Sequence, residues 1–285
     1  MLTRRGVFAA AGWVLAGPAG ATEPAGPFAA IEHGLGGRVG IAALDTGTGR
    51  GVGWRERERF PLCSTFKLIA AGLILSRVDR GEEKLDRHMA YAKSDLVAHS
   101  PVTERHADEG MSLAEICRAA ITRSDNTAAN LMLASFGGPP ALTEFARRLG
   151  DQVTRLDRTE TALNEALPDD PRDTTAPAAM LGLMKALLVE DTLSAASRRQ
   201  LGEWLLANET GAARIRAAAP SGWDVGDKTG TGERGAAGDV AILRPPGRAP
   251  ILLAVYLHGS EKPIADLNAA IASSAGIALK ELAAG

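Results

Sequence analysis

The run of residues 65–76 is apolar on every face and carries a single charge, Lys67. Such a run predicts a helix that is buried on all sides. Taking an unpaired ammonium out of water costs several kcal/mol or forces the amine to be neutral. Lys67 must therefore have partners or a chemical task inside the fold.

Ser64 lies three residues before Lys67, so the two side chains share a helix face and can touch. A desolvated lysine of lowered pKa beside a serine hydroxyl is one way to activate that hydroxyl for acyl transfer. The alternative is a surface helix whose lysine points to solvent. A Ser-x-x-Lys string arises by chance about once in a chain of this size, so the string alone is a weak signal.

The first residues have the pattern of an export signal. Arg4 and Arg5 precede a weakly apolar stretch, residues 6–15, and a small-residue cleavage site ends at Ala21. The paired arginines indicate a twin-arginine signal, with Sec export as the alternative. The stretch is well short of the roughly 20 apolar residues that span a membrane. We therefore expect residues 1–21 to be removed, and the mature chain to be soluble and periplasmic or secreted, without a membrane span.

Charge and composition argue against several kinds of partner. The formal charge is −2, and it becomes −4 once Arg4 and Arg5 are removed. No basic run favours binding to nucleic acid or to an anionic membrane. The histidines and cysteines lack metal-ligand spacing, so we expect no metal and no other cofactor. The sequence shows no exposed apolar patch, and we expect a monomer.

The chain has two cysteines, and an exported chain with two cysteines can form one disulfide. Cys63, however, adjoins Ser64, and Cys117 lies in a predicted helix that opens with a capping box of Ser112 and Glu115. We expect two free thiols, with Cys117 filling space in the core.

Strand patterns occur near both ends of the chain, and helical patterns fill the middle. The predicted strands are residues 39–43, 51–56, 223–228, 237–243 and 251–257. The predicted helices are residues 28–35, 65–75, 112–121, 127–136, 141–149, 176–188 and 194–207, and a closing helix with one face formed by Leu267, Ile271, Ala275, Ala278 and Leu282.

This order predicts an α/β two-domain protein of the α+β type. Residues 22–60 and 208–285 form a sheet domain with flanking helices, because the strands at the two ends must build one sheet. Residues 61–207 form an inserted, all-helical domain. The site is expected in the cleft between the two domains, where ligand pockets are common.

Two further strings make the Ser-x-x-Lys signal specific. Ser124-Asp125-Asn126 lies between two predicted helices, and Lys228-Thr229-Gly230 ends a predicted strand. In isolation each is expected as a capped turn or a strand end. Together, in this order, the three strings resemble those of the class A serine β-lactamases, members of the penicillin-recognising serine hydrolases. The resemblance runs from about residue 30 to the C-terminus and implies a five-stranded antiparallel sheet.

The resemblance implies a role for each of these residues. Ser64 is the nucleophile, beside Lys67, and Ser124 gives a proton to the departing ring nitrogen. The backbone N–H groups of Ser64 and Thr231 form the oxyanion hole. The remaining substrate contacts are implied for Asn126, which grips the acylamino side chain, and for Lys228, Thr229, Gly230 and Thr231 at the carboxylate.

Residues 155–173 are charged, contain two prolines after residue 167, and predict a compact Ω-type loop. The loop is either a solvated connection or part of the site. It carries Glu160-x-x-Leu-Asn164, similar to the β-lactamase loop whose glutamate and asparagine hold the hydrolytic water. General-base help from a carboxylate is typically worth ~10² to 10⁴ in rate. The resemblance also implies that Arg158 and Asp173 pin the neck of the loop.

Some positions depart from familiar members of the family. Ala237 stands where many relatives have an arginine, and Arg214 matches an alternative source of that guanidinium for the substrate carboxylate. His99 stands where an aromatic wall is usual at the cleft edge, which predicts weaker and pH-sensitive stacking. Thr161 replaces a common proline after Glu160, and the resemblance leaves open whether the peptide between them is cis.

Some carbapenem-hydrolysing relatives have a disulfide from the cysteine before the nucleophile. The partner position of Cys63 is Gly232 in this chain, which argues against that subgroup.

We expect hydrolysis of the β-lactam amide of penicillins and also of cephalosporins, through an acyl-enzyme on Ser64 that a water activated by Glu160 releases, and hence β-lactam resistance. A D-Ala-D-Ala carboxypeptidase or transpeptidase is the first alternative, because it shares the three strings but lacks the deacylating glutamate. A non-hydrolysing β-lactam sensor domain is the second. The sequence leaves open whether Lys67 or Glu160 is the acylation base.

Overall fold

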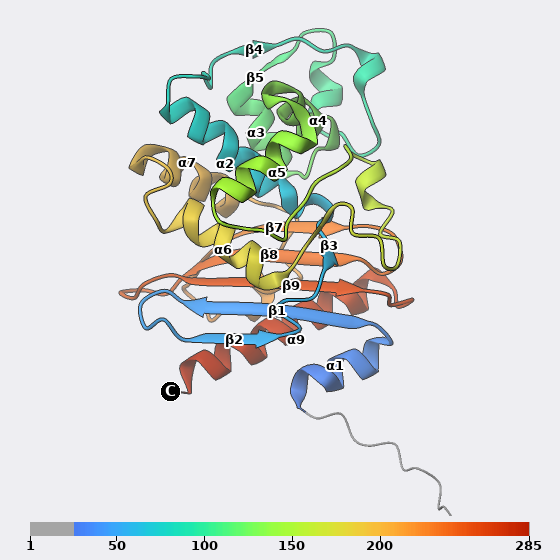
Figure 1. The fold of residues 1–285 in the computed structure, drawn as a ribbon, viewed down its shortest axis with the longest axis vertical. Coiled ribbons are helices and arrows are strands. Elements are labelled where there is room, and N and C mark those ends of the chain that lie inside the picture. Colours follow the sequence, from blue (N-terminus) through green and yellow to red (C-terminus); the bar gives the residue numbers. More distant parts are fainter. Residues whose placement is uncertain (1–25, 285) are drawn as a thin grey trace, which may run out of the picture.

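The computed structural model describes residues 26–284, and their centre is a five-stranded antiparallel sheet of order β2-β1-β9-β8-β7 (Figure 1). The strands are β1 (Arg38–Asp45), β2 (Gly51–Trp54), β7 (Asp224–Thr231), β8 (Ala237–Arg244) and β9 (Ile251–His258). β9 is buried over its whole length, as expected for a continuous apolar run in the middle of a sheet covered on both faces. The predicted sheet is confirmed.

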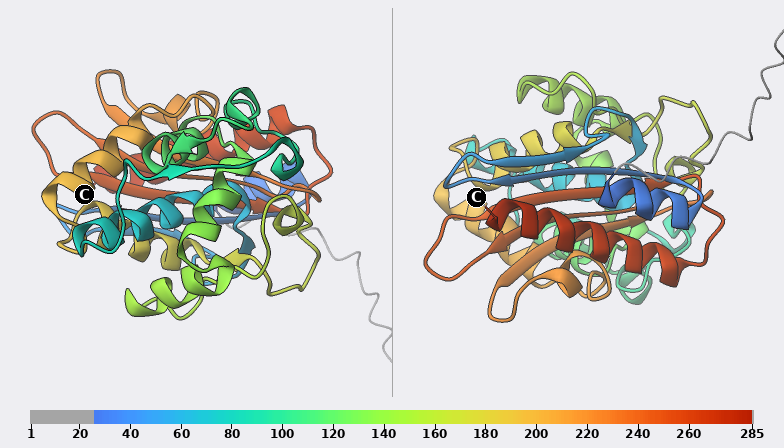
Figure 2. Two further views of the ribbon diagram at one scale, coloured as in Figure 1. Left: turned by 90° about the horizontal axis from the view of Figure 1, so that it is seen from above. Right: turned by 90° about the horizontal axis from the view of Figure 1, so that it is seen from below.

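One face of the sheet is covered by α1 (Pro27–Leu35) and α9 (Ile264–Ala283), which cross it side by side (Figure 2). The predicted apolar face of α9 is buried: Leu267, Ile271, Ala275, Ala278 and Leu282. The short α8 (Ile215–Ala218) packs on α9 on the same side. The two ends of the described chain therefore share one hydrophobic core.

The other face carries a second core, built around α2 (Phe66–Asp79). The residues of α2 are buried from Phe66 through Ser76, and a 3₁₀ turn, Cys63–Thr65, precedes the helix. The surrounding helices are α3 (Leu113–Thr122), α4 (Asn126–Phe136), α5 (Gly138–Arg148), α6 (Pro177–Leu188) and α7 (Ala195–Leu206). The predicted buried helix is thus the central element of this core.

Short elements join these helices. Two small sheets pair β3 (Phe60–Pro61) with β6 (Thr174–Thr175), and β4 (His88–Met89) with β5 (Met111–Ser112). The 3₁₀ turns are Lys93–Asp95, Thr103–His106 and Ala162–Asn164. β3 precedes the turn that leads into α2, and β6 directly follows the Ω-type loop, residues 155–173. Their pairing therefore brings these two segments together.

Most element boundaries lie within a few residues of the predicted ones, and the differences have local causes. α5 begins at Gly138 rather than at residue 141, because a proline fits the first helical turn. β7 continues past Lys228 to Thr231, paired with Ala237 of β8. The Ser112 and Glu115 capping box opens α3 as predicted. Cys63 and Cys117 are both buried free thiols, which confirms that expectation.

The predicted export signal lies outside the described residues, and the domain boundaries near residues 60 and 208 remain a prediction. Within residues 26–284, no helix combines the length and the apolar character needed to cross a membrane.

Candidate active site

A cavity of about 330 Å³ opens beside the end of strand β7, close to the segments that lead into α2 and α4. It is lined by Ser64, His99, Ser124, Asn126, Asn164, Thr210, Arg214, Thr229, Gly230 and Thr231. All of these except Thr210 were predicted site residues. Lys67, Glu160 and Lys228 lie buried directly behind the lining, so the structure brings the whole predicted set together.

The nucleophile candidate Ser64 sits in the 3₁₀ turn that leads into α2. Its Oγ donates a hydrogen bond of 2.8 Å to Oε1 of Glu160. Thr65 Oγ1 donates to the carbonyl of Leu62 at 2.6 Å, which holds the turn closed. Gly230 of β7 packs against this turn, and a Cβ at that position would lie only 3.1 Å from the backbone nitrogen of Ser64. Glycine is therefore required for the strand to approach the nucleophile so closely.

Lys67 is fully buried, and its ammonium has partners, as the sequence required. Nζ donates to Asn126 Oδ1 at 2.7 Å and to the carbonyl oxygen of Ser124 at 2.8 Å, and it lies 3.1 Å from Glu160 Oε1. Burial lowers the pKa of Lys67, and the charge of Glu160 opposes that shift. Ser64 and Lys67 thus meet through the shared oxygen of Glu160, and no hydrogen bond joins them directly.

Ser124 lies between the two buried lysines. Its Oγ accepts from Lys228 Nζ at 3.0 Å and from Lys67 Nζ at 3.4 Å. Lys228 Nζ also donates to the carbonyl of Thr229 at 2.8 Å. Burial, followed by the positive charge of Lys67, holds the pKa of Lys228 well below its usual range. A hydroxyl between two amines can both receive and pass on a proton.

Asp125 explains why the Ser-Asp-Asn string forms this turn. Its Oδ1 accepts the Ala128 N–H and caps α4, while Oδ2 accepts the N–H groups of Val102 and Thr103 at 2.9 Å. Asp125 therefore ties the segment that carries His99 to the start of α4. His99 lines the cavity, as predicted, and its Nε2 lies 3.1 Å from the carbonyl of Arg123.

Glu160 lies on the Ω-type loop, residues 155–173, whose ends are pinned by charge. Arg158 Nε lies 2.6 Å from Asp173 Oδ2, and the backbone N–H groups of Asp157 and Arg158 donate to Asp173 Oδ1. The expectation that Arg158 and Asp173 hold the neck is confirmed. The Glu160–Thr161 peptide is cis, which answers the question that the sequence left open.

Two asparagines fix the Glu160 carboxylate and backbone. Asn164 Nδ2 donates to Glu160 Oε2 at 2.6 Å, while the buried Asn164 Oδ1 accepts from no donor within residues 26–284. Asn130 of α4 bonds the backbone of Glu160 twice, from Nδ2 to the carbonyl and from the Glu160 N–H to Oδ1, each at 2.9 Å. Sequence reasoning missed Asn130, which lies 30 residues from Glu160 and belongs to none of the strings.

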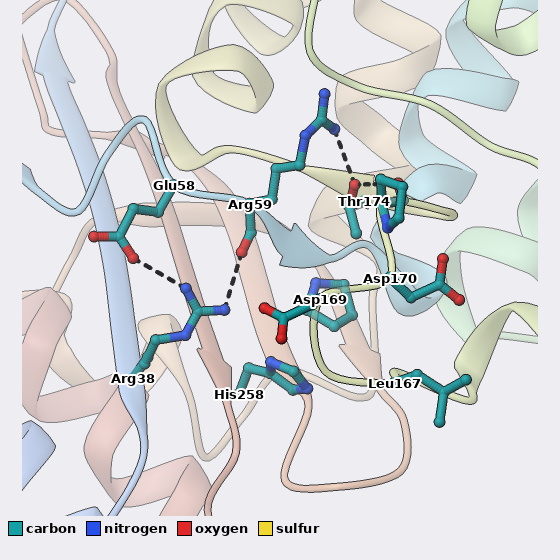
Figure 3. Close-up of a pocket in the computed structure, with 10 residues that line it drawn as sticks. Arg38, Glu58, Arg59, Leu167, Asp169, Asp170, Thr174 and His258 are labelled. Atoms are coloured by element: carbon teal, nitrogen blue, oxygen red, sulfur yellow. Dashed lines mark hydrogen bonds and ion pairs between the residues drawn. The ribbon is translucent and has the colours of Figure 1, made fainter.

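The outer side of the loop borders a second cavity, of about 320 Å³, which holds none of the predicted site residues (Figure 3). His258 of β9 and Asp169 of the loop both line it. His258 Nε2 lies 3.0 Å from the carbonyl of Ala166 and thereby anchors the loop to the sheet. This cavity lacks a nucleophile with a neighbouring base, so we place the reacting centre at Ser64.

Arg214 brings a guanidinium to the cavity, whereas Ala237 has none. It lines the cavity, donates from Nη2 to Thr231 Oγ1 at 2.7 Å, and donates from Nη1 to the carbonyls of Gly230 and Gly238. Thr210, which the sequence analysis did not identify as a site residue, contributes a hydroxyl 2.6 Å from that of Thr229.

Gly232 lies opposite Cys63, as the resemblance implied. A Cβ at position 232 would lie 2.8 Å from Cys63 Sγ. With glycine in this position, Cys63 stays a thiol.

Comparison with known proteins gives the family. Residues 27–282 match the model of the beta-lactamase enzyme family. PenP from Rhodopseudomonas palustris, a protein assigned to the class A β-lactamases, is 58% identical, with a TM-score of 0.87 over 90% of this chain and 97% of that one. The class A β-lactamase of the last common ancestor of Gram-negative bacteria is 56% identical, with a TM-score of 0.88 over 90% and 97% of the two chains. Sequence, fold and site agree, and the chain belongs to the class A serine β-lactamases.

Proposed function

We propose that this chain hydrolyses the β-lactam amide of penicillins and cephalosporins through an acyl-enzyme on Ser64 that Glu160 helps to release. The observation that carries the proposal is the position of the Glu160 carboxylate, whose Oε1 contacts Ser64 and whose Oε2 is held by Asn164. One carboxylate can thus serve both the attack of the serine and the later attack of water.

Acylation begins with the loss of the Ser64 proton. Lys67 Nζ has four acceptor atoms around it, the carbonyl oxygen and Oγ of Ser124, Asn126 Oδ1 and Glu160 Oε1, and this set stabilises an ammonium. An ammonium has no lone pair to take a proton. We therefore assign the proton transfer from Ser64 to Glu160, with Lys67 stabilising the charge that moves between them.

The serine oxygen then attacks the lactam carbonyl, and the C–N bond of the ring breaks. Backbone N–H groups of Ser64 and Thr231 stabilise the oxyanion. Ser124 gives its hydroxyl proton to the ring nitrogen and recovers one from Lys67, which contacts its Oγ. Lys67 in turn takes from Glu160 the proton that came from Ser64, so Glu160 is a carboxylate again before deacylation. Asn126 receives the acylamino group, and Lys228, Thr229, Thr231 and Arg214 receive the carboxylate.

Deacylation needs a water beside Glu160 and the ester carbonyl. Asn164 Oδ1 is buried and has no donor among residues 26–284, so it can accept a hydrogen bond from that water while Nδ2 holds Glu160. Glu160 takes the proton of the water as the water oxygen attacks the acyl carbon, and gives that proton to Ser64 Oγ as the ester C–O bond breaks. This step separates the proposal from a carboxypeptidase or a sensor domain.

The test is the Glu160→Gln variant with a penicillin. We expect a long-lived adduct on Ser64, visible as the mass of enzyme plus intact penicillin, and loss of multiple turnover. The matched control is Glu165→Gln on the same loop, since Glu165 pairs only with arginines and should keep turnover. Turnover by Glu160→Gln at the parent rate would contradict the deacylation role. A stable acyl-enzyme in the unmutated chain would instead favour the carboxypeptidase or the sensor.

We also propose that the chain works outside the cytoplasm as a monomer and confers β-lactam resistance there. The paired arginines of residues 1–21 support a twin-arginine signal cleaved near Ala21, with Sec export as the alternative. Replacing both arginines by lysine should block export and resistance if the twin-arginine route is used. Unchanged export would indicate Sec.

A further inference from the structure

Asp239 of β8 is a fully buried acid to which the proposed mechanism gives no task. It is paired across the ladder with Thr229, so its side chain lies on the same sheet face as the Thr229 hydroxyl. Its Oδ2 accepts the N–H of Ile215 at 3.0 Å, and its Oδ1 has no donor within residues 26–284. Burial, followed by the neighbouring charge of Asp227, raises the pKa of Asp239 well above its usual range.

The Asp239 bond fixes the backbone next to Arg214. Arg214 immediately precedes Ile215, and its own N–H donates to the carbonyl of Gly211 at 3.0 Å. The peptide units on both sides of Arg214 are therefore fixed, one by Gly211 and one by Asp239. The guanidinium is held by Asn268 Oδ1, by Thr231 Oγ1 and by the carbonyls of Gly230 and Gly238, and the bonds to the backbone on both sides of Arg214 fix the point from which its side chain reaches these acceptors.

A second buried carboxylate holds the rest of the same segment, residues 208–216. Asp227 of β7 accepts from Asn208 Nδ2 at 2.7 Å and forms an ion pair with Arg216. Gly211 packs on Asp227 so closely that a Cβ there would overlap its carboxylate. Asp227 therefore has partners for both carboxylate oxygens, whereas among residues 26–284 the side chain of Asp239 has one hydrogen-bond donor, the Ile215 N–H.

We propose that Asp239 is a positioning residue for recognition of the substrate carboxylate, because its bond to the Ile215 N–H holds the backbone that presents Arg214 to the cavity. This proposal rests on the carboxylate role proposed above for Arg214. Asp239 itself is fully buried and is absent from the cavity lining, so it acts only through Arg214.

The experiment compares Asp239→Ala, which removes the acceptor, with Asp239→Asn, which keeps it and mimics the protonated acid. Each variant is assayed with a cephalosporin and with the methyl ester of the same compound. For the acid we expect Asp239→Ala to raise KM roughly tenfold and to change kcat less than about twofold, as for loss of one buried hydrogen bond. Asp239→Asn should stay near the parent. For the ester, which has no carboxylate, the parent and Asp239→Ala should have the same KM.

A second comparison uses Arg214→Ala. In that background Asp239→Ala should add less than about twofold to KM, because the group that it positions is gone. Two results would overturn the positioning role. In the first, Asp239→Ala raises KM equally for the acid and for the ester. In the second, Asp239→Asn raises KM for the acid as much as Asp239→Ala does.

The same data separate the two proposals. If Arg214→Ala leaves the KM for the acid unchanged, the carboxylate role of Arg214 is wrong. If Arg214→Ala raises KM and Asp239→Ala does not, only the role of Asp239 is wrong.

Discussion

The two sides of the active site are built in different ways. Ser64 and Lys67 lie at the start of a helix whose residues are buried through Ser76, so apolar packing fixes them. Glu160 and Asn164 lie on a loop with one short 3₁₀ turn, and ion pairs and hydrogen bonds to backbone fix them. The first side depends on the hydrophobic core, and the second depends on a few polar contacts that single substitutions can remove. The difference predicts that stability and deacylation can be damaged separately.

The largest effect is expected from Asp173→Ala. This change removes the acceptor of two backbone N–H groups and leaves Arg158 without its partner at the neck. We expect deacylation to slow by about 10² to 10⁴, the usual contribution of a positioned general base, while acylation falls less. Stopped-flow acylation and the recovery of free enzyme measure the two steps.

The matched control on the same loop is Asp170→Ala, which removes an ion pair with the half-exposed Arg172. Such surface pairs contribute little, so its kinetics should resemble those of the parent. Equal losses in Asp170→Ala and Asp173→Ala would show that any change in the loop is harmful and that the neck is not special.

Ile74→Ala on α2 is expected to change activity less than Asp173→Ala does, and to lower stability more. Ile74 is fully buried, and removing such a side chain costs about 2 to 5 kcal/mol in the free energy of unfolding. Urea unfolding measures this loss, and kcat/KM per folded molecule should remain within about twofold. Leu206→Ala, at an exposed position, should shift the free energy of unfolding by less than about 0.5 kcal/mol. A change in deacylation for Ile74→Ala would contradict the separation of the two sides.

The smallest effect is expected in the pH profile of kcat/KM, through the titration of Lys228, which is fully buried next to the cavity. Because burial and Lys67 lower the pKa of Lys228, its positive charge is lost on raising the pH before the ordinary lysine value of 10.5 is reached. The alkaline limb of kcat/KM should therefore lie below pH 10.5. In Lys228→Arg it should move upward, since a guanidinium has a pKa above about 12. If the alkaline limb of Lys228→Arg stays where it is in the parent, the group that titrates there is Lys67 and not Lys228.

Sequence alone predicts the elements that apolar patterns define. The helix around Lys67 and the strand β9 are runs long enough to be recognised, and the strings at Ser64, Ser124 and Lys228 identify one wall of the cavity. The contacts that hold the loop could not be predicted. Asn130 and His258 bond loop backbone from 30 and 92 residues away, and a side chain that bonds a carbonyl leaves no local pattern.

The expected direct contact of Ser64 with Lys67 shows the same limit. Their spacing places both on one helix face, but the loop inserts Glu160 Oε1, which contacts both groups. Which acceptor a serine uses is decided by tertiary packing, and the helix periodicity could only say that the two residues are neighbours. Thr210 was missed for a similar reason, because it joins the cavity lining through tertiary packing, beside the hydroxyl of Thr229, which is 19 residues away.

The burial of Cys63 has a consequence for the chemical lifetime of the enzyme. Burial raises the pKa of this thiol to about 12, so it stays protonated near neutral pH. Oxidants and electrophiles react with the thiolate and must also reach it, and Cys63 is enclosed. Outside the cytoplasm, where we propose that the protein works, the thiol next to the nucleophile is therefore slow to react, and an electrophile that enters the cavity finds Ser64 in the lining but not Cys63.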